Sequence, residues 1–329
     1  MIAAIAAAND AQHATSYGDD ALTQALHAAF CEVFETPVEV FLTTTGTAAN
    51  ALSIAALTPP WGAVLCHREA HIETDECGAP EFFSNGAKLV LIDGPCARVT
   101  PDGLHAALRR HQRGVHSVRA SVLSLTNATE RGTTYSPEQT AALADIAHSG
   151  GLSVHLDGAR FANALVHQGC TPAELTHRAG VDVLSFGATK NGALNAEAII
   201  VFNSERVGDI ARLRKRSGHL VSKHRYLAAQ LLAYLNDDLW LTLAARANAN
   251  AARIAAAAGD WCSHACESNS VFLKPGAAVL DALRAGGVQF YDWGDGEAPE
   301  ARLVASWCQA ETDLAQLENL LYALRAERG

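Results

Sequence analysis

Short apolar segments alternate with helical segments between residues 38 and 202, and this alternation constrains the fold more than any other feature of the sequence. Strands are expected at 38–42, 63–66, 88–92, 121–125, 152–156, 181–186 and 197–202. Helices are expected at 21–34, 101–113, 137–149 and 171–178, with another ending near residue 57. Strands that are connected through helices usually pair in parallel. We therefore predict an α/β fold with a mainly parallel sheet covered on both faces.

The pattern changes after residue 203. Helices are expected at 206–215, 221–235 and 239–258, followed by short strands near 270–273 and 302–307 between helices at 277–285 and 312–326. This order is typical of a small α+β domain. The predicted organisation is a short N-terminal arm (1–16), a large domain (17–245) and a small C-terminal domain (246–329).

Composition narrows the classes of function. Of the 329 residues, 49% are hydrophobic and 18% are charged, as in globular proteins with a sizeable core. The net charge of −10 argues against a nucleic acid partner, because phosphate binding requires clustered Lys and Arg. No apolar stretch is long enough to span a membrane, and the N-terminus lacks the basic start of a secretory signal. We expect a cytoplasmic protein that does not contact membranes.

The eight cysteines show no paired Cys-x-x-Cys spacing. Cys262 and Cys266, with His264 between them, come closest to a metal-binding pattern, but structural zinc needs four ligands. We therefore expect reduced thiols and no metal.

Lys190 is the first candidate for chemistry. It follows the apolar segment 181–186 and is bracketed by small residues, as if a buried strand delivered an amine to a cleft. Burial lowers the pKa of an ammonium group and frees the amine for imine formation with a carbonyl. The local sequence is equally compatible with a lysine that reaches water. The assignment therefore depends on partners elsewhere in the chain.

Three other strand ends carry candidate residues. After the strand at 38–42, Gly46 and Thr47 open a helix, and helix N-termini bind anions such as phosphate through backbone N–H groups. His71 follows the next strand, and Asp157 and Arg160 come after a later one. In open α/β sheets the ligand site lies beyond the carboxyl ends of the strands, where these residues would meet.

The combination predicts a pyridoxal 5'-phosphate site. Gly46 and Thr47 would hold the phosphate. Asp157 would keep the pyridine nitrogen protonated, so that the ring accepts electrons, and Lys190 would form the Schiff base. The spacing between Asp157 and Lys190, about thirty residues, suits one strand–helix–strand unit.

Several stretches of the sequence carry a family resemblance. They are Tyr17–Asp20, Thr45–Asn50, Ala70–His71, Glu76–Gly86, Asp157–Arg160, Phe186–Gly192 and Arg302–Val304. With them the chain resembles, over nearly its whole length, the threonine aldolases of the beta-eliminating lyase family, and residues 76–86 are similar to the low-specificity branch. The resemblance implies the seven-stranded sheet of fold type I pyridoxal phosphate enzymes, with the cofactor bound by residues 17–245.

The resemblance also implies roles for single residues. His71 would stack on the cofactor ring. Arg160, beside the cofactor, and Arg302 would bind the substrate carboxylate, a task that suits guanidinium geometry. Tyr17 would approach the substrate and Lys215 the cofactor in the site of a neighbouring subunit, which implies a homotetramer of catalytic dimers or a homodimer.

The implied reaction is the reversible cleavage of a β-hydroxy-α-amino acid to glycine and an aldehyde. His71 and an active-site water are both candidates for the base that removes the hydroxyl proton. β-Elimination or transamination on the same cofactor, and an inactive protein that only binds ligands, remain alternatives. L-Threonine, L-allo-threonine and phenylserine are all compatible substrates, and Thr129 stands where some relatives have a histidine.

The N-terminus departs from the family pattern. Relatives usually have a Ser-Asp pair and a helix of several turns before the Tyr-Gly motif, whereas here only a few residues separate Asp10 from Tyr17. We expect that helix to be missing and Ala8 to stand in place of the serine that contacts the substrate carboxylate.

Overall fold

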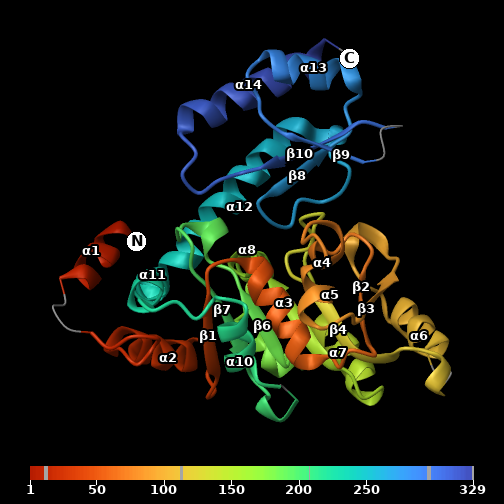
Figure 1. Ribbon diagram of the computed structural model, residues 1–329. Helices are drawn as coiled ribbons and strands as arrows, with labels where there is room; N and C mark the ends of the chain where they lie inside the picture. Colours follow the sequence, from red (N-terminus) through yellow and green to blue (C-terminus); the bar gives the residue numbers. More distant parts are fainter. Residues whose placement is uncertain (11–13, 112–113, 207, 295–297, 328–329) are drawn as a thin grey trace.

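A seven-stranded sheet forms the centre of the molecule (Figure 1). The computed structural model describes residues 1–10, 14–111, 114–206, 208–294 and 298–327. The strands are β1 (Glu39–Thr43), β2 (Gly62–His67), β3 (Lys88–Ile92), β4 (Arg119–Thr126), β5 (Ser153–Gly158), β6 (Val183–Phe186) and β7 (Glu197–Val201), in the order β1-β7-β6-β5-β4-β2-β3. β7 runs antiparallel to both neighbours, and all other pairs are parallel. The predicted α/β fold with a mainly parallel sheet is confirmed.

The strand directions bring distant segments of the chain to one edge of the sheet. Because β7 is antiparallel to both β1 and β6, the six other strands point the same way. The turns after β1, β2, β4, β5 and β6 therefore open at one edge, where β7 also begins. Every residue of β2, β5, β6 and β7 is buried, as expected for strands covered by helices on both faces.

Two groups of helices cover the two faces. One face carries α3 (Gly46–Leu57), α4 (His71–Thr74), α5 (Ala79–Phe83) and α10 (Ile210–Arg216); the other carries α2 (Ala21–Val33), α6 (Pro101–Arg110), α7 (Pro137–Ser149), α8 (Phe161–Gln168) and α11 (Arg225–Leu235). Successive residues of a strand point to opposite faces of the sheet and so belong to different hydrophobic cores. Val64 belongs to the core with Ile54 of α3, whereas Leu65 belongs to the core with Phe30 of α2.

A long helix leads from this unit to a second, smaller sheet (Figure 1). It is α12 (Leu239–Ala258), and it is followed by β8 (Ser270–Leu273), α13 (Ala277–Ala285), β9 (Tyr291–Trp293), β10 (Glu300–Val304) and α14 (Glu311–Ala326). The antiparallel order β8-β10-β9 encloses a separate core with the helices, which confirms a small C-terminal α+β unit. Residue 245 lies inside α12, and the proposed division into domains stays a prediction.

The structure differs from the sequence prediction at several element boundaries. α10 begins at Ile210 rather than 206, α11 at Arg225 rather than 221, β10 spans Glu300–Val304 rather than 302–307, and the helix expected at 171–178 is α9 (Pro172–Leu175) followed by a separate 3-10 turn. The prediction missed α8 and β9, which are short. Residues 112–113 of one predicted helix and 11–13 of the predicted arm lie outside the described residues.

The N-terminal segment contains a helix that the prediction of a short arm missed. α1 (Ile2–Asn9) lies beside α11, where the Arg225 guanidinium donates to the Ala8 carbonyl at 3.2 Å and the Tyr226 hydroxyl donates to the Asn9 carboxamide at 2.7 Å. Within the ranges described, no helix has both the length and the apolar character needed to cross a membrane.

Candidate active site

A cavity opens at the sheet edge where the parallel strands end. Its empty space, which includes the part open to solvent, amounts to about 490 Å³. The lining residues are Gly46, Thr47, Ala49, Asn50, His71, Asp157, Ala159, Ser185, Phe186, Gly187, Lys190 and Glu197. Five residues that the sequence singled out therefore meet here: Gly46, Thr47, His71, Asp157 and Lys190.

The turn between β1 and α3 presents a helix N-terminus to this cavity. The Thr45 hydroxyl caps α3 by accepting a hydrogen bond from the Ala48 N–H at 3.1 Å. A Cβ at Gly46 would meet no other protein atom within 4 Å, so the glycine leaves room for a ligand. The partial positive charge of the helix end favours an anion here. His219, which the sequence prediction missed, lies beside the turn, with Nδ1 3.1 Å from the Thr44 hydroxyl.

Asp157 is buried at the end of β5, and hydrogen bonds hold both of its oxygens. Oδ1 accepts from the Ala159 N–H and Oδ2 from Asn50 Nδ2, each at 2.9 Å. The Asn50 amide also donates to Glu76 Oε1 at 2.9 Å. The sequence prediction missed Asn50 and Glu76. The available signal was the carboxamide of Asn50 in α3, a helix made mostly of small and apolar residues. A buried carboxamide needs polar partners.

Lys190 lies on the tight turn after β6, and its side chain lines the cavity. The surrounding protein lowers the pKa of its amine by removing water, and the positive charge of Arg160 lowers it further. Glu197 holds this turn in place, because its carboxylate accepts a hydrogen bond from the Ala188 N–H at 2.7 Å. The amine of Lys190 thus lines the cleft at the end of β6, and its role in the chemistry stays a prediction, whereas the contact of Glu197 was not foreseen.

Arg160 and Arg302 lie close together, and neither forms an ion pair with an acid of the described chain. The Nε atoms of both are buried without a hydrogen-bond partner. Burial lowers the pKa of Arg160 to about 10, and the charge of Arg302 contributes to this decrease. Arg302, on β10, packs against Trp293 with Cζ 5.0 Å from the ring centroid. Neither arginine lines the cavity itself. Buried, unpaired guanidinium groups favour the binding of an anion.

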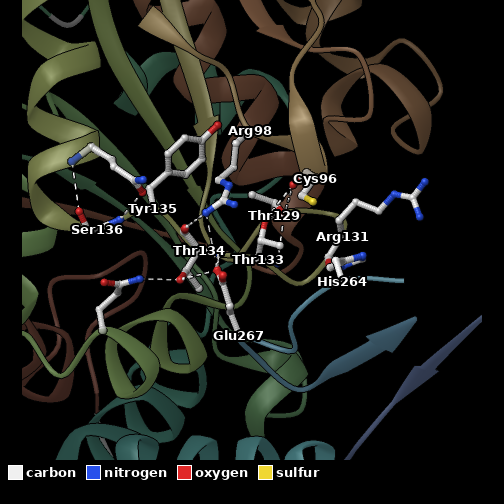
Figure 2. A network of polar contacts seen from close by, with 12 residues as sticks. Cys96, Arg98, Thr129, Arg131, Thr133, Thr134, Tyr135, Ser136, His264 and Glu267 are labelled. Carbon is white, nitrogen blue, oxygen red and sulfur yellow. Dashed lines mark hydrogen bonds and ion pairs between the residues drawn. The ribbon is translucent and has the colours of Figure 1, made fainter. Parts of the chain in front are cut away.

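The segment after β4 brings a buried carboxyl group toward the site and connects it to the C-terminal sheet. Burial raises the pKa of Glu130, which the sequence prediction did not single out. Two contacts anchor the segment, as Figure 2 shows: the Thr134 N–H donates to the Glu267 carboxylate at 2.7 Å, and His264 Nε2 lies 2.6 Å from the Arg131 carbonyl oxygen. The sequence gives no signal that Glu130 is buried near the site, because a single acidic residue in a polar turn is usually exposed.

Tyr17 and Lys215 lie together, and neither of them lines the cavity. Both are exposed, and the Lys215 ammonium sits 5.1 Å from the centroid of the Tyr17 ring. The Tyr17 N–H donates to the Ser222 carbonyl at 2.9 Å, which fixes the chain at this surface. The structure therefore pairs these two predicted residues with each other rather than with the site of their own chain.

The sheet order and the C-terminal unit are those of fold type I enzymes, a class that depends on pyridoxal phosphate. The chain belongs to the beta-eliminating lyase family, whose model matches residues 1–270. Members of this family use pyridoxal 5'-phosphate.

Two relatives and one solved structure are similar over nearly the whole chain. The low specificity L-threonine aldolase of Pseudomonas aeruginosa is 43% identical, over 99% of this chain and 94% of the relative. An enzyme of the same name from another Pseudomonas strain is 41% identical, over 95% of this chain and 90% of its own length. The threonine aldolase structure from Leishmania major superposes with a TM-score of 0.91 at 26% identity, covering 98% of this chain and 95% of that one.

Proposed function

We propose that this protein is a low-specificity L-threonine aldolase, a pyridoxal phosphate-dependent carbon–carbon lyase. It would cleave L-threonine, L-allo-threonine and related β-hydroxy-α-amino acids such as phenylserine, reversibly, to glycine and an aldehyde. One observation carries the proposal: in a chain so similar to enzymes of this name, a lysine, a buried carboxylate and an anion-binding turn line a single cavity.

The residues of the cavity suit the parts of pyridoxal phosphate. Gly46 leaves open space at a helix N-terminus, where the phosphate would bind together with Thr47. Asp157 presents a carboxylate with fixed orientation to the pyridine nitrogen, and Lys190 presents an amine. When bound, the cofactor supplies an aldehyde that forms imines and a protonated ring that accepts the electrons of a bond broken at Cα.

Lys190 would anchor the cofactor covalently. Its lowered pKa increases the fraction of neutral amine, and only the neutral amine attacks a carbonyl. The hydrogen bond between Glu197 and the Ala188 N–H fixes the turn, so that the amine reaches the cavity from a defined direction.

Arg160 and Arg302 would bind the substrate carboxylate. A carboxylate placed between these two guanidinium groups would accept hydrogen bonds from them, including from the Nε atoms that have no partner among the described residues. Holding the carboxylate sets the rotation about the bond from Cα to nitrogen. The bond from Cα to Cβ can then stand perpendicular to the cofactor ring and break in preference to the bond to hydrogen.

His71 would contact the cofactor ring and the substrate hydroxyl. It lines the cavity at the start of α4, and its Nδ1 lies 3.5 Å from the Asp75 carboxylate, which orients the imidazole. In this position His71, or a water molecule that it holds, would accept the proton of the β-hydroxyl group as the aldehyde forms.

The test is a substrate panel with purified protein and pyridoxal phosphate. L-Threonine, L-allo-threonine and phenylserine are supplied separately, and glycine and aldehyde are measured. Lys190→Ala should abolish both the products and the absorption of the imine, whereas Lys88→Ala, an exposed lysine at the start of β3, should change neither. Ammonia together with a 2-oxo acid that keeps the carbon skeleton of the substrate would favour elimination, and a β-hydroxy-2-oxo acid without ammonia would favour transamination; either result would contradict the proposal.

We further propose a cytoplasmic homotetramer of catalytic dimers in which Tyr17 and Lys215 reach the site of the neighbouring subunit. Their exposure and their separation from the cavity of their own chain support this placement. Sedimentation gives the mass. If Lys190→Ala and Lys215→Ala are each inactive, exchange of subunits between them should restore activity, because hybrid dimers contain one intact site. No recovery in verified hybrids would contradict shared sites.

A further inference from the structure

A second buried carboxyl group, Glu76, lies behind Asp157. The amide nitrogen of Asn50 connects them, since Nδ2 donates to Glu76 Oε1 and to Asp157 Oδ2 at 2.9 Å each. The exposed fraction of each of the three residues is only 2–3%. An NH₂ group carries two hydrogens, so Asn50 gives one to each acid and has no further donor on its side chain.

The chain conformation next to Glu76 is unusual. Glu76 follows α4, and the residues after it, Cys77 and Gly78, both adopt left-handed backbone conformations, with φ of 51° and 71°. Such a conformation is unfavourable for a cysteine and persists only where the surroundings enforce it. The Ala79 N–H closes the turn on the Glu76 carbonyl at 2.9 Å. The turn thus keeps the Glu76 side chain on the buried side of the segment.

Two negative charges cannot share one buried amide without a large cost. Burial raises the pKa of Glu76 to about 8, and the charge of Asp157 adds to this increase. Glu76 is therefore neutral near pH 7, and its protonated carboxyl group has one O–H donor. Glu76 Oε2 and Asn50 Oδ1 are the two atoms of the group that are buried without a partner, and they are a complementary donor and acceptor.

The other charged groups around Glu76 do not change this conclusion. Lys190 favours its ionised form, whereas Asp157 and Glu130 oppose it, and α3 carries no charged residue. The other titratable residues of its own segment, 71–83, are His71, Glu73, Asp75, Cys77 and Glu81. Burial has a larger effect on the pKa of Glu76 than any of the charged neighbours has.

We propose that Glu76 is a positioning residue: its neutral carboxyl group fixes the Asn50 amide, which in turn orients the Asp157 carboxylate toward the cofactor nitrogen. The inference rests on the proposed function only in that Asp157 meets the cofactor. Glu76 itself does not line the cavity; it contacts Asn50, which does. An uncharged residue at this position leaves Asp157 as the single negative charge of the group.

The first test measures thermal unfolding of the cofactor-free protein, so it does not depend on the reaction. Between the ordinary glutamate pKa and about 8, the folded state holds a proton on Glu76 that the unfolded state has lost, so stability falls as pH rises through this window. Glu76→Gln removes this dependence. The difference in thermal midpoint, Glu76→Gln minus wild type, should therefore increase by at least about 3 °C from about pH 5.5 to about pH 8.5.

The matched control is Glu73→Gln, an exposed glutamate of the same segment, which should show no such gain. The second test is cofactor affinity at neutral pH. Glu76→Gln should bind pyridoxal phosphate within about threefold of wild type, because glutamine keeps the acceptor for Asn50. Glu76→Ala should bind it at least about tenfold more weakly, with an altered imine absorption band.

Two outcomes would overturn the proposal. One is a midpoint difference between Glu76→Gln and wild type that stays constant with pH, which would mean that Glu76 is charged throughout. The other is a loss of cofactor affinity in Glu76→Gln as large as in Glu76→Ala. A wild-type protein that binds the cofactor but forms no glycine would instead contradict the proposed function and leave these two measurements intact.

Discussion

At the scale of single residues, the site is defined by polar groups that have no partner among the residues that the structure describes. Arg160 and Arg302 have buried Nε atoms without acceptors, and Gly46 leaves space at a helix N-terminus. The anions that would satisfy these groups are a substrate carboxylate and a cofactor phosphate. The amide nitrogen of Asn50, in contrast, donates both of its hydrogens, one to Glu76 and one to Asp157.

Arg302→Lys keeps the positive charge but loses the planar fork that binds a carboxylate through two hydrogen bonds. We expect KM for L-threonine to rise at least about tenfold, since a hydrogen bond between charged groups contributes about 1.5–3 kcal/mol. Steady-state kinetics gives the change. The control is Arg253→Lys, which should leave KM unchanged. Arg253 lies on the surface of α12, and its guanidinium donates to Glu311 and Glu318 of α14. An unaltered KM in Arg302→Lys would remove this residue from the substrate site.

His155 gives a prediction about pH. It is buried between Ser124 and Ser185, with 2.9 Å hydrogen bonds to both hydroxyls, and burial lowers its pKa to about 4. The unfolded chain gains a proton near the ordinary histidine pKa, before the folded chain does, so the folded state loses about 3 kcal/mol as pH falls through this interval. The urea midpoint of His155→Gln should fall less than that of wild type between about pH 7 and about pH 5. His167→Gln, on the exposed side of α8, should follow wild type. Parallel curves for His155→Gln and wild type would contradict a neutral, buried His155.

The sequence predicted the residues that immediately follow a strand, because the carboxyl ends of parallel strands meet at one place. His71, Asp157 and Lys190 are of this kind. Asn50 and Glu197 were missed, because one lies within a helix and the other begins the antiparallel strand β7. Their positions depend on how α3 and β7 dock on the sheet, which the spacing of apolar residues does not reveal.

At the scale of secondary structure elements, the turns after β5 and β6 approach each other closely. The Gly187 N–H donates to the Gly158 carbonyl at 3.1 Å, and a Cβ at Gly187 would lie 2.6 Å from Cα and the carbonyl oxygen of Ala159. Only a glycine permits this contact, which places the Lys190 turn directly beside the Asp157 turn.

Gly187→Ala should therefore destabilise the protein by about 2–3 kcal/mol, because backbone on one side must move. The displaced turn should also weaken imine formation at Lys190. Gly46→Ala is the matched comparison: its Cβ meets no protein atom, so stability should be kept while cofactor affinity falls. Urea unfolding and absorbance titration separate the two effects. Equal stability of Gly187→Ala and wild type would show that the turns can separate without cost.

Most of the strands and long helices could be predicted, since each has a clear apolar period. The antiparallel direction of β7 could not, because a buried apolar strand such as Glu197–Val201 reads the same in either direction. The short helices α1 and α8 and the strand β9 were also missed. α8 starts directly after Arg160. The stretch Asp157–Arg160 was interpreted only as part of a ligand site, and the start of a helix after it was not predicted.

At the scale of the whole molecule, the two sheets are joined by α12 and by a charged contact at Arg131. This arginine follows Glu130 and donates to Glu69 at 2.8 Å and to Glu300 of β10 at 2.6 Å. Its guanidinium also lies over the ring of Phe272 of β8, 5.3 Å from the centroid. The contact therefore connects the segment after β4 to the sheet that carries Arg302.

Arg131→Ala should be the most damaging change at this junction, because the Glu300 carboxyl is 1% exposed and would lose its closest cationic partner. Removing one member of a buried ion pair costs about 3–5 kcal/mol, and Lys274, 3.8 Å from Glu300, should reduce this to about 3 kcal/mol. Arg68→Ala, which breaks a solvent-exposed pair with Asp93, should leave the stability nearly unchanged. Urea unfolding measures both, and KM for L-threonine should rise only in Arg131→Ala, as Arg302 moves with its sheet. Equal, small losses of stability in the two variants would mean that the ion pairs of Arg131 do not hold the two sheets together.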